Sequence, residues 1–295
     1  MQDREPEDFR QTTTLRDIWQ LFSQDKIALA SFYVFLLLIL TALFSRFIAP
    51  YHSDQQFIGL ELLPPSWVQG GQIAYFFGTD DIGRDVFSRL IIGTSYTFGA
   101  SLIVVIFTAI LGGILGIWAG MSQGIKSRVL NHIFDSFLTI PILLIAIIIA
   151  TLMQASLFNA MLAITLALLP YFIHEIYKAI QVELKKEYVL MLRLEGASNW
   201  LLLKETILPN ISVQYIREIS RAFTIAILDI SALGFISLGA QRPTPEWGAM
   251  IKDSIELIYL APWAVILPGA AIITSVLISL IFTNGLCKAM EKYDK

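Results

Sequence analysis

A carboxylate in the middle of an apolar run is the most informative chemical group in this sequence. Asp229 follows Arg221 by eight residues, about 12 Å along a helix, inside an apolar run from 222 to 240. A charge at that depth in a bilayer costs at least ~2.5 kcal/mol, so the side chain must face protein or water. It would attract a cationic substrate, pair with hydroxyls of a neighbouring helix or subunit, or be protonated. The sequence leaves these readings open.

Other reactive side chains form no recognisable catalytic or metal site. His52, His132 and His174 are scattered without ligand spacing, and a single cysteine, Cys287, excludes an internal disulfide. No Ser/His/Asp set and no G-x-S-x-G is visible. A nucleotide-binding phosphate loop is also missing, since the nearest fragment, 124–127, has the wrong spacing. We expect no catalytic residue, no metal and no cofactor, and no ATP hydrolysis by this chain.

Two polar segments are rich in turn formers. The segment Thr79–Asp85 combines capping residues with an internal counter-charge, Arg84, and lacks the alternating ligands of a calcium loop. It is therefore expected to cap and brace. In 243–248 two prolines make a rigid corner. Trp247 there is expected to anchor at the lipid headgroups or, with Glu246, to contact a binding protein or substrate. Asp229, Glu246 and Trp247 are the candidates for a substrate pathway.

The stretch 187–210, EYVLMLRLEGASNWLLLKETILPN, is apolar enough for a membrane helix but carries five charges. Gly196 is expected to end one short helix, Ser198 or Asn199 to cap a second, and Pro209 to end or bend it. The expected apolar stripes are Leu184, Tyr188, Met191 and Leu192 on the first helix and Trp200, Leu203 and Ile207 on the second. These faces must pack at the membrane surface, on the protein's own helix ends, on headgroups or on a docked protein.

The composition places these groups in a membrane protein. The 295 residues are 56% hydrophobic and only 15% charged, too apolar for a water-soluble domain. A membrane helix needs about 20 mostly apolar residues. Six segments qualify and predict an all-α membrane protein: 27–48, 94–119, 133–153, 157–177, 222–240 and 263–286.

Positive charge predicts the orientation of the spans. With both termini on the inner side, 16 of the 21 Lys and Arg residues lie inside and 5 outside. Both termini are therefore expected in the cytoplasm. The predicted divisions are an N-terminal segment 1–26, a first span 27–48, a periplasmic loop 49–93, a core 94–287 with an inner loop 178–221, and a tail 288–295.

Two further patterns concern packing. Gly112, Gly116 and Gly120 recur every four residues and predict one nearly flat helix face for close contact with another helix. In 6–22 the apolar residues Leu15, Ile18, Trp19 and Phe22 share one helical face. We expect an amphipathic helix on the inner membrane surface, capped by Thr14, contacting lipid or a partner and taking no part in a core.

The inner loop resembles the cytoplasmic loop of ATP-binding-cassette (ABC) importer permeases. That loop reads EAA, three residues, Gly, nine residues, I-x-L-P, and Gly196 to Pro209 has this spacing. The residues around this loop are similar to those of the dipeptide/oligopeptide permease family. The segments 77–101 and 233–251 and the pair Asp135 and Pro141 also resemble that family. One departure concerns packing, because the usual small residues are replaced by Leu190, Met191 and Leu192.

The resemblance implies a type I importer permease of six helices in the bacterial inner membrane. It would pair with a homologous B-type permease, two cytoplasmic ATPases that hydrolyse the ATP, and a periplasmic binding protein. The residues it assigns to ATPase coupling are Glu187, Leu192, Gly196, Ala197, Ser198, Trp200 and Pro209. Net charge −3 gives no indication of a nucleic-acid partner.

The resemblance favours import of peptides, including cationic or antimicrobial ones. Export of a small polycation such as a polyamine by the same architecture is an alternative. A secondary transporter is a further one, although no internal repeat is visible and intramembrane charges are few. A membrane enzyme is disfavoured by the missing catalytic set.

Overall fold

The long apolar runs of this chain become long helices lying side by side. The computed structural model describes residues 14–122 and 138–293, which are helical with no β-strand beyond two isolated bridges. The helices are α1 (Thr14–Gln24), α2 (Lys26–Ile48), α3 (Val86–Thr94), α4 (Ala100–Met121), α6 (Ile142–Thr151), α7 (Leu157–Glu183), α8 (Glu187–Leu194), α9 (Asn199–Leu202), α10 (Leu208–Phe235), α11 (Trp247–Ser254) and α12 (Pro262–Tyr293). Two π-helical turns, η1 (Ser95–Gly99) and η2 (Leu203–Ile207), and a 3₁₀ turn, η3 (Ile255–Leu257), complete them.

Four helical stretches among the described residues are long and apolar enough to cross a membrane. They are Lys26–Ile48, Val86–Met121, Leu157–Glu183 and Pro262–Tyr293, and each contains one of the predicted spans almost entirely. The second runs through α3, η1 and α4 and is longer than expected. These four predictions are confirmed as apolar helices of spanning length.

The other two predicted spans fare differently. Part of 133–153, including Asp135, lies outside the described residues, and its described part is the ten-residue α6. The predicted span 222–240 overlaps α10, which begins fourteen residues earlier, at Leu208, and ends at Phe235, five residues before the predicted end. Its first half carries Arg217, Glu218 and Arg221. Six crossings therefore stay a prediction.

The glycine face of α4 packs directly on α7. A side-chain carbon placed at Gly112, Gly116 or Gly120 would come within 2.9 Å of Phe172, Ile176 or Ile180. The predicted close helix contact is thus confirmed, with α7 as the partner. At the end of this contact Gln181 Nε2 donates a hydrogen bond to the carbonyl of Gly120 at 2.7 Å.

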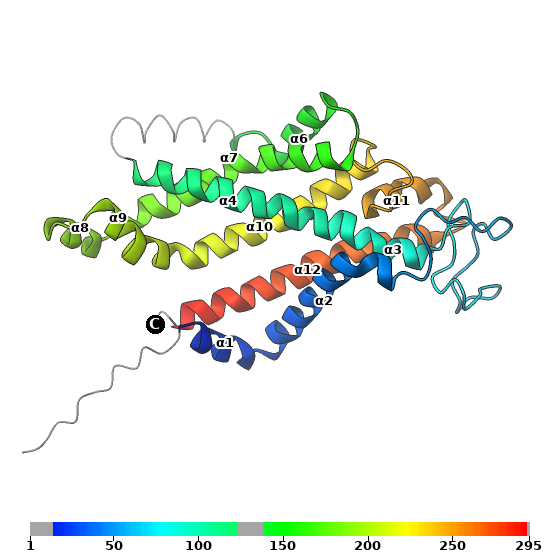
Figure 1. Cartoon of the computed structure of the whole chain (residues 1–295), viewed down its shortest axis with the longest axis horizontal. Helices are drawn as coiled ribbons and strands as arrows, with labels where there is room; N and C mark the ends of the chain where they lie inside the picture. The colour runs from blue at the N-terminus through cyan, green and yellow to red at the C-terminus, as the bar shows by residue number, and fades with distance from the viewer. Residues whose placement is uncertain (1–13, 123–137, 294–295) are drawn as a thin grey trace, which may run out of the picture.

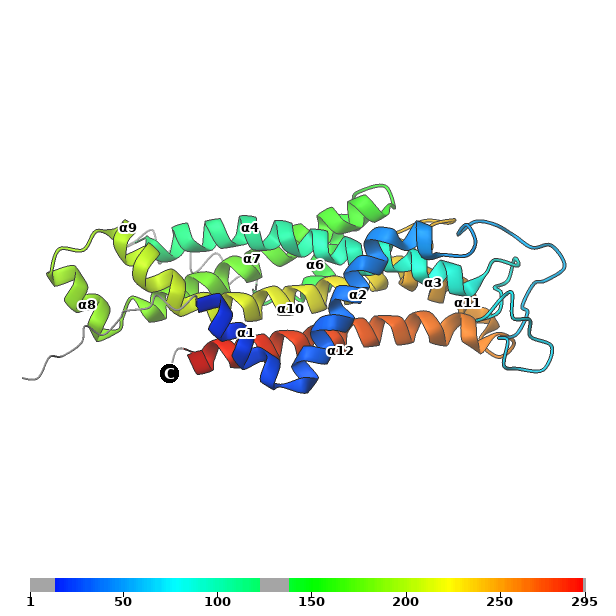
Figure 2. The same cartoon turned by 60° about the horizontal axis from the view of Figure 1, so that its bottom comes forward.

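The N-terminal helix α1 packs against α2 and α12 (Figure 2). Phe22 is buried at 2% exposure, and its ring lies 6.2 Å from Phe32 and 6.1 Å from Phe282. The expectation that this helix takes no part in a core was therefore wrong. Leu15 and Trp19 on the same helix are exposed, as expected of a surface helix.

The two polar regions lie at opposite ends of the bundle. Figure 1 shows α8 and α9 at one end and α3, α11 and the loop before α3 at the other. The inner loop predicted as 178–221 is shorter in the structure, because α7 continues to Glu183 and α10 begins at Leu208. The intervening segment 184–207, which contains α8, α9 and η2, is called the elbow below.

Candidate functional site

The elbow turns at Gly196, as predicted. Its φ of +91° is a left-handed conformation that suits glycine, and it ends α8. Ser198 then caps α9, accepting a hydrogen bond from the amide of Leu201 at 3.2 Å. Both expected devices, the stop and the cap, are present in the expected order, so a tight turn holds two short helices in a fixed relation.

The face that the elbow buries differs from the predicted stripes. Val189, Leu202 and Ile207 are buried against the core, whereas Tyr188, Met191 and Trp200 are exposed. The predicted stripes were therefore partly wrong, because helices of eight and four residues are too short for spacing alone to fix their rotation. Among the predicted coupling residues, Glu187, Gly196, Ser198 and Pro209 are exposed and Leu192 and Ala197 half-buried.

An apolar surface covers the outside of the elbow. Its exposed large side chains are Leu190, Met191, Leu194, Trp200 and Leu201. Two of the three residues that replace the family's small alanines, Leu190 and Met191, belong to it, so they face outward and do not crowd the turn. This surface stands beyond the ends of the long helices (Figure 1).

The elbow continues into α10 without leaving helical structure. After α9 the chain forms η2 and then α10, whose first turn contains Pro209. Pro209 was expected to end or bend a helix; it is the second residue of α10, directly after the π-helical turn η2, and helical structure continues on both sides of it. It therefore does not end the helical run, and the bend stays a prediction. The elbow and α10, the helix that bears Asp229, are therefore joined by continuous helical structure.

The other end of the molecule holds a buried network of charges. Arg84 Nε donates to Asp80 Oδ2 at 2.6 Å, within the predicted Thr79–Asp85 segment. Arg89 Nη1 donates to the carbonyls of Ser53 at 2.8 Å and Pro243 at 3.3 Å. Arg89 was not singled out in the sequence, although a lone arginine in VFSRLIIGT is the kind of signal that marks a buried ion pair. It ties the loop before α3 to the loop before α11.

A second set of contacts joins the same loops. Arg242 Nε donates to Asp253 Oδ1 at 2.8 Å, and Asp253 Oδ2 lies 3.9 Å from Arg84 Nη2. Asp85 caps α3 by accepting from the Ser88 amide at 2.7 Å. Burial raises the pKa of Asp81. Burial also raises the pKa of Asp85, although hydrogen bonds from Ser88 act in the opposite direction. These groups brace this end of the molecule, as expected for the segment.

Glu246 and Trp247 are fully buried within the chain. Glu246 caps α11, accepting from the amides of Gly248 at 2.9 Å and Ala249 at 2.8 Å and from Thr97 Oγ1 at 2.9 Å. Trp247 Nε1 donates to the carbonyl of Leu90 at 3.1 Å. Burial raises the pKa of Glu246. Both side chains are enclosed by the chain itself and help to seat α11, so the expected headgroup anchor at Trp247 is contradicted. The substrate-pathway role of Glu246 and Trp247 stays a prediction.

Asp229 is buried in α10 at 6% exposure. Its Oδ2 atom has no hydrogen-bond partner among the described residues. The described residues thus supply no hydroxyl to this atom, and the alternatives of a pathway group or of pairing with a second subunit both stay predictions.

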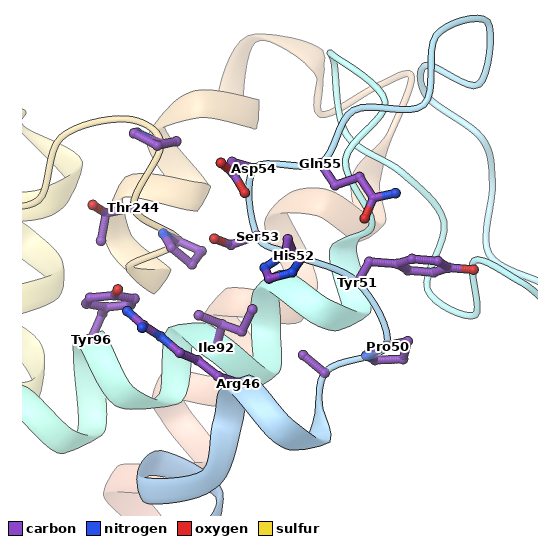
Figure 3. A pocket seen from close by; sticks show the side chains of 13 residues that line it. Arg46, Pro50, Tyr51, His52, Ser53, Asp54, Gln55, Ile92, Tyr96 and Thr244 are labelled. Carbon is purple, nitrogen blue, oxygen red and sulfur yellow. The ribbon is translucent and has the colours of Figure 1, made fainter.

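An open polar cavity of ≈ 380 Å³ adjoins the bracing network. Arg46 at the end of α2 and Tyr96 in η1 lie side by side along one wall, with His52, Asp54 and Thr244 on the other sides (Figure 3). The cavity is continuous with the surface that carries the loop before α11. It marks this end, like the elbow, as a surface with room for a partner or solute.

Comparisons with known proteins agree with the geometry. A family model described as "Binding-protein-dependent transport system inner membrane component" matches residues 112–292, more than half of the chain. A second, described as "N-terminal TM domain of oligopeptide transport permease C", matches residues 13–65. Together the two cover the elbow, α10 and the first span.

Individual relatives are similar to this chain over nearly its whole length. Among them, the Sap-type C subunits are more similar in sequence than the dipeptide permease. The chain is 64% identical to the peptide transport system permease protein SapC of Haemophilus influenzae over 295 residues, all of both chains. It is 48% identical to SapC of Escherichia coli O6:H1 over 277 residues, 94% of each. It is 37% identical to the dipeptide transport system permease protein DppC of Escherichia coli K12 over 279 residues, 95% of this chain and 93% of the relative. The chain therefore belongs to the inner-membrane permease components of binding-protein-dependent transport systems, within the dipeptide/oligopeptide permease family.

Proposed function

We propose that this chain is one of two pore-forming subunits of an ATP-driven peptide importer in a bacterial inner membrane. The family match gives the class of machine, and the names of the relatives, peptide and dipeptide transport permeases, support peptides as the substrate. The chain's own chemistry agrees, since its sequence contains no phosphate loop and a separate protein must supply the energy.

The observation that carries the proposal is the apolar surface of the elbow. Leu190, Met191, Leu194, Trp200 and Leu201 are exposed on two short capped helices that stand beyond the long helices. Apolar side chains held on a rigid turn suit insertion into a groove of another protein, and a large aromatic ring contributes strongly to such contacts. Two ATPase subunits are the proposed partners, one docked on this elbow and one on that of a homologous B-type permease.

The opposite end is the proposed side of substrate entry. The cavity lined by Arg46, Tyr96 and Thr244 and the braced loops beside it form the surface offered to a periplasmic binding protein. Asp229 supports a preference for cationic peptides, because its buried Oδ2 atom has no hydrogen-bond partner among the described residues and a carboxylate oxygen attracts positive charge. Whichever of pathway and subunit pairing holds, Asp229 moves with α10.

The experiment is reconstitution of the whole transporter in proteoliposomes, with the second permease, both ATPases and the binding protein. Uptake of a labelled cationic peptide is measured with and without ATP. Trp200→Ala is expected to weaken ATPase binding by about 30-fold or more, since truncating a well-packed interface tryptophan costs at least ~2 kcal/mol. The matched control is Trp118→Ala, because Trp118 on α4 is 68% exposed and Trp200 is 70% exposed.

Three results would contradict the proposal. Uptake at the full rate without the ATPases would make the chain a different kind of transporter. Equal effects of Trp200→Ala and Trp118→Ala would remove the elbow as the docking site. ATP-dependent loss of a polyamine from the vesicles, with no peptide uptake, would replace import of peptides by export of a small polycation.

A further inference from the structure

The base of the elbow is closed by a tyrosine hydroxyl that joins three helices. The hydroxyl of Tyr188, in the first turn of α8, donates to Glu183 Oε1 at the last residue of α7. The same hydroxyl accepts from Nδ2 of Asn210, in the first turn of α10, at 2.8 Å. The end of α7, the start of α8 and the start of α10 therefore meet at a single oxygen atom, which together with its two partners is called the clasp below.

The clasp is built around a buried carboxylate. Glu183 is only 4% exposed, and its Oε2 lies 2.7 Å from Nζ of Lys186, so one oxygen takes the hydroxyl and the other the ammonium. A hydrogen bond to a charged acceptor is stronger and more directional than one between neutral groups. The neighbouring apolar contacts of Val189 and Ile207 hold the elbow against the core but fix no direction of pull, because dispersion contacts are non-directional.

The hydroxyl is a stable donor under physiological conditions. Burial, and next the hydrogen bond to Glu183, raise the pKa of Tyr188 to about 12. Asn210 opposes this shift, since it donates to the hydroxyl oxygen. The proton therefore stays on Tyr188 at neutral pH.

Any motion of the elbow must pass this point. The elbow leaves α7 at Glu183 and enters α10 at Leu208, so a push on Trp200 reaches the long helices through the two ends that the clasp joins. If the ends separate, the elbow rotates on its own and α7 stays behind. With the clasp closed, the elbow and the ends of α7 and α10 move together.

We propose that Tyr188 is a positioning residue that couples the ATPase-driven motion of the elbow to α7 and α10 through Glu183 and Asn210. The inference rests on the proposed function and adds to it the residue through which the stroke is transmitted. Docking belongs to the exposed outer surface of the elbow, whereas transmission belongs to its base. The two roles predict different defects when they are removed.

The test is Tyr188→Phe in the full reconstituted transporter, which removes the one oxygen and keeps the ring. ATPase binding and basal ATP hydrolysis should remain. The number of peptides moved per ATP hydrolysed should fall by at least about fivefold, the lower end of ordinary coupling between sites. Tyr259→Phe is the control, because Tyr259 lies between η3 and α12, away from the elbow, and is 97% exposed.

Two further variants separate coupling from folding. Asn210→Ala removes one arm of the clasp and should lower the peptide-to-ATP ratio in the same direction, while Tyr188→Phe combined with Asn210→Ala should be no worse than Tyr188→Phe alone. Melting temperatures of the single and double variants are measured alongside, because loss of a hydrogen bond to the buried Glu183 carboxylate lowers stability whether or not Tyr188 couples the helices. A purely structural role would lower the melting temperature and leave the peptide-to-ATP ratio of the folded fraction unchanged.

The outcome distinguishes this inference from the proposed function. An unchanged peptide-to-ATP ratio in Tyr188→Phe, with the ATPases still docked at Trp200, overturns the coupling role alone. A ratio that falls equally in Tyr188→Phe and Tyr259→Phe overturns it as well. Failure of the ATPases to dock at the elbow in the unchanged protein overturns the proposed function.

Discussion

Single residues set the shape of the elbow. Gly196 adopts φ +91°, and a side-chain carbon added there would meet nothing within 4 Å. The position therefore demands glycine for its backbone conformation and not for lack of space. Ser198 completes the turn by capping α9. Together they hold the exposed ring of Trp200 away from the bundle.

Gly196→Ala should therefore strain the turn without a clash. A left-handed conformation costs a residue with a side chain roughly 1–2 kcal/mol, which would weaken ATPase docking by about 5- to 30-fold. The affinity of the ATPases for the purified permease pair, measured by sedimentation or on a surface that carries the permeases, checks this prediction.

The comparison variant is Gly59→Ala. Gly59 also has a positive φ, +85°, and also has nothing within 4 Å, but it lies in the loop before α3. The same backbone strain there should leave ATPase docking intact. If Gly59→Ala weakens docking as much as Gly196→Ala does, the geometry of the turn is not what the ATPase recognises.

At the scale of elements, α4 and α7 make a close contact that repeats at every fourth residue of α4. Three glycines of α4 face Phe172, Ile176 and Ile180 of α7 at distances that leave no room for a methyl group. Without bulk between them the two backbones approach closely, and packing takes the place of the hydrophobic effect that lipid does not supply.

Gly116→Ala should separate these helices. The new carbon would lie 2.8 Å from Cβ of Ile176, an atom next to the backbone that cannot move aside alone. Overpacking of this kind costs about 1–3 kcal/mol. The melting temperature of the purified protein in detergent should fall, while Gly269→Ala in α12, whose nearest neighbour is 4.0 Å away, should leave it unchanged or slightly raised. Equal melting temperatures for the two variants would show that α4 and α7 do not depend on close contact.

The sequence was informative where one residue type permits one local structure. The stop at Gly196, the cap at Ser198 and the glycine face of α4 were all predictable, since each follows from a missing or short side chain. The rotation of the short helices about their axes was not predictable, because Trp200 was expected on a packed face and is exposed. Neither was the start of α10, because Arg217 and Arg221 lie on a helix that passes from a polar to an apolar environment without a break.

The candidate site was predictable in place but not in detail. The residues predicted for coupling lie in the elbow or, for Pro209, directly after it, because they are close together in the sequence, and their coupling role stays a prediction. The clasp was missed, since Glu183, Tyr188 and Asn210 are brought together only by the meeting of three helices. Glu246 and Trp247 were expected at a surface and are buried, because α11 folds back against η1 and α3.

At the scale of the whole molecule, the two candidate functional surfaces lie at opposite ends of one bundle. The elbow is at one end and the braced loops with their cavity are at the other, with α1 and the end of α12 toward the elbow (Figure 1). This arrangement accords with the orientation predicted from Lys and Arg counts, in which the termini and the elbow share the cytoplasmic side.

Labelling of introduced cysteines tests that orientation. The chain has a single cysteine, Cys287, which is buried at 2% exposure and therefore gives a low background. Ile58→Cys, at a site 94% exposed in the loop before α3, should react with a membrane-impermeant maleimide added to spheroplasts. Trp200→Cys should react only after the membrane is opened. Reaction of both without opening, or the reverse order, would contradict the predicted orientation.

The meshed surfaces of α4 and α7 also limit how the machine can change shape. Glycines at every fourth residue of α4 receive large side chains at every fourth residue of α7. The two helices therefore fit together only as they stand or after a slip of four residues, about 6 Å. A smaller slide would bring the large side chains of α7 against residues of α4 that have side chains. In a transport cycle α4 and α7 should therefore move as one rigid unit, and any gradual sliding should occur between other helices.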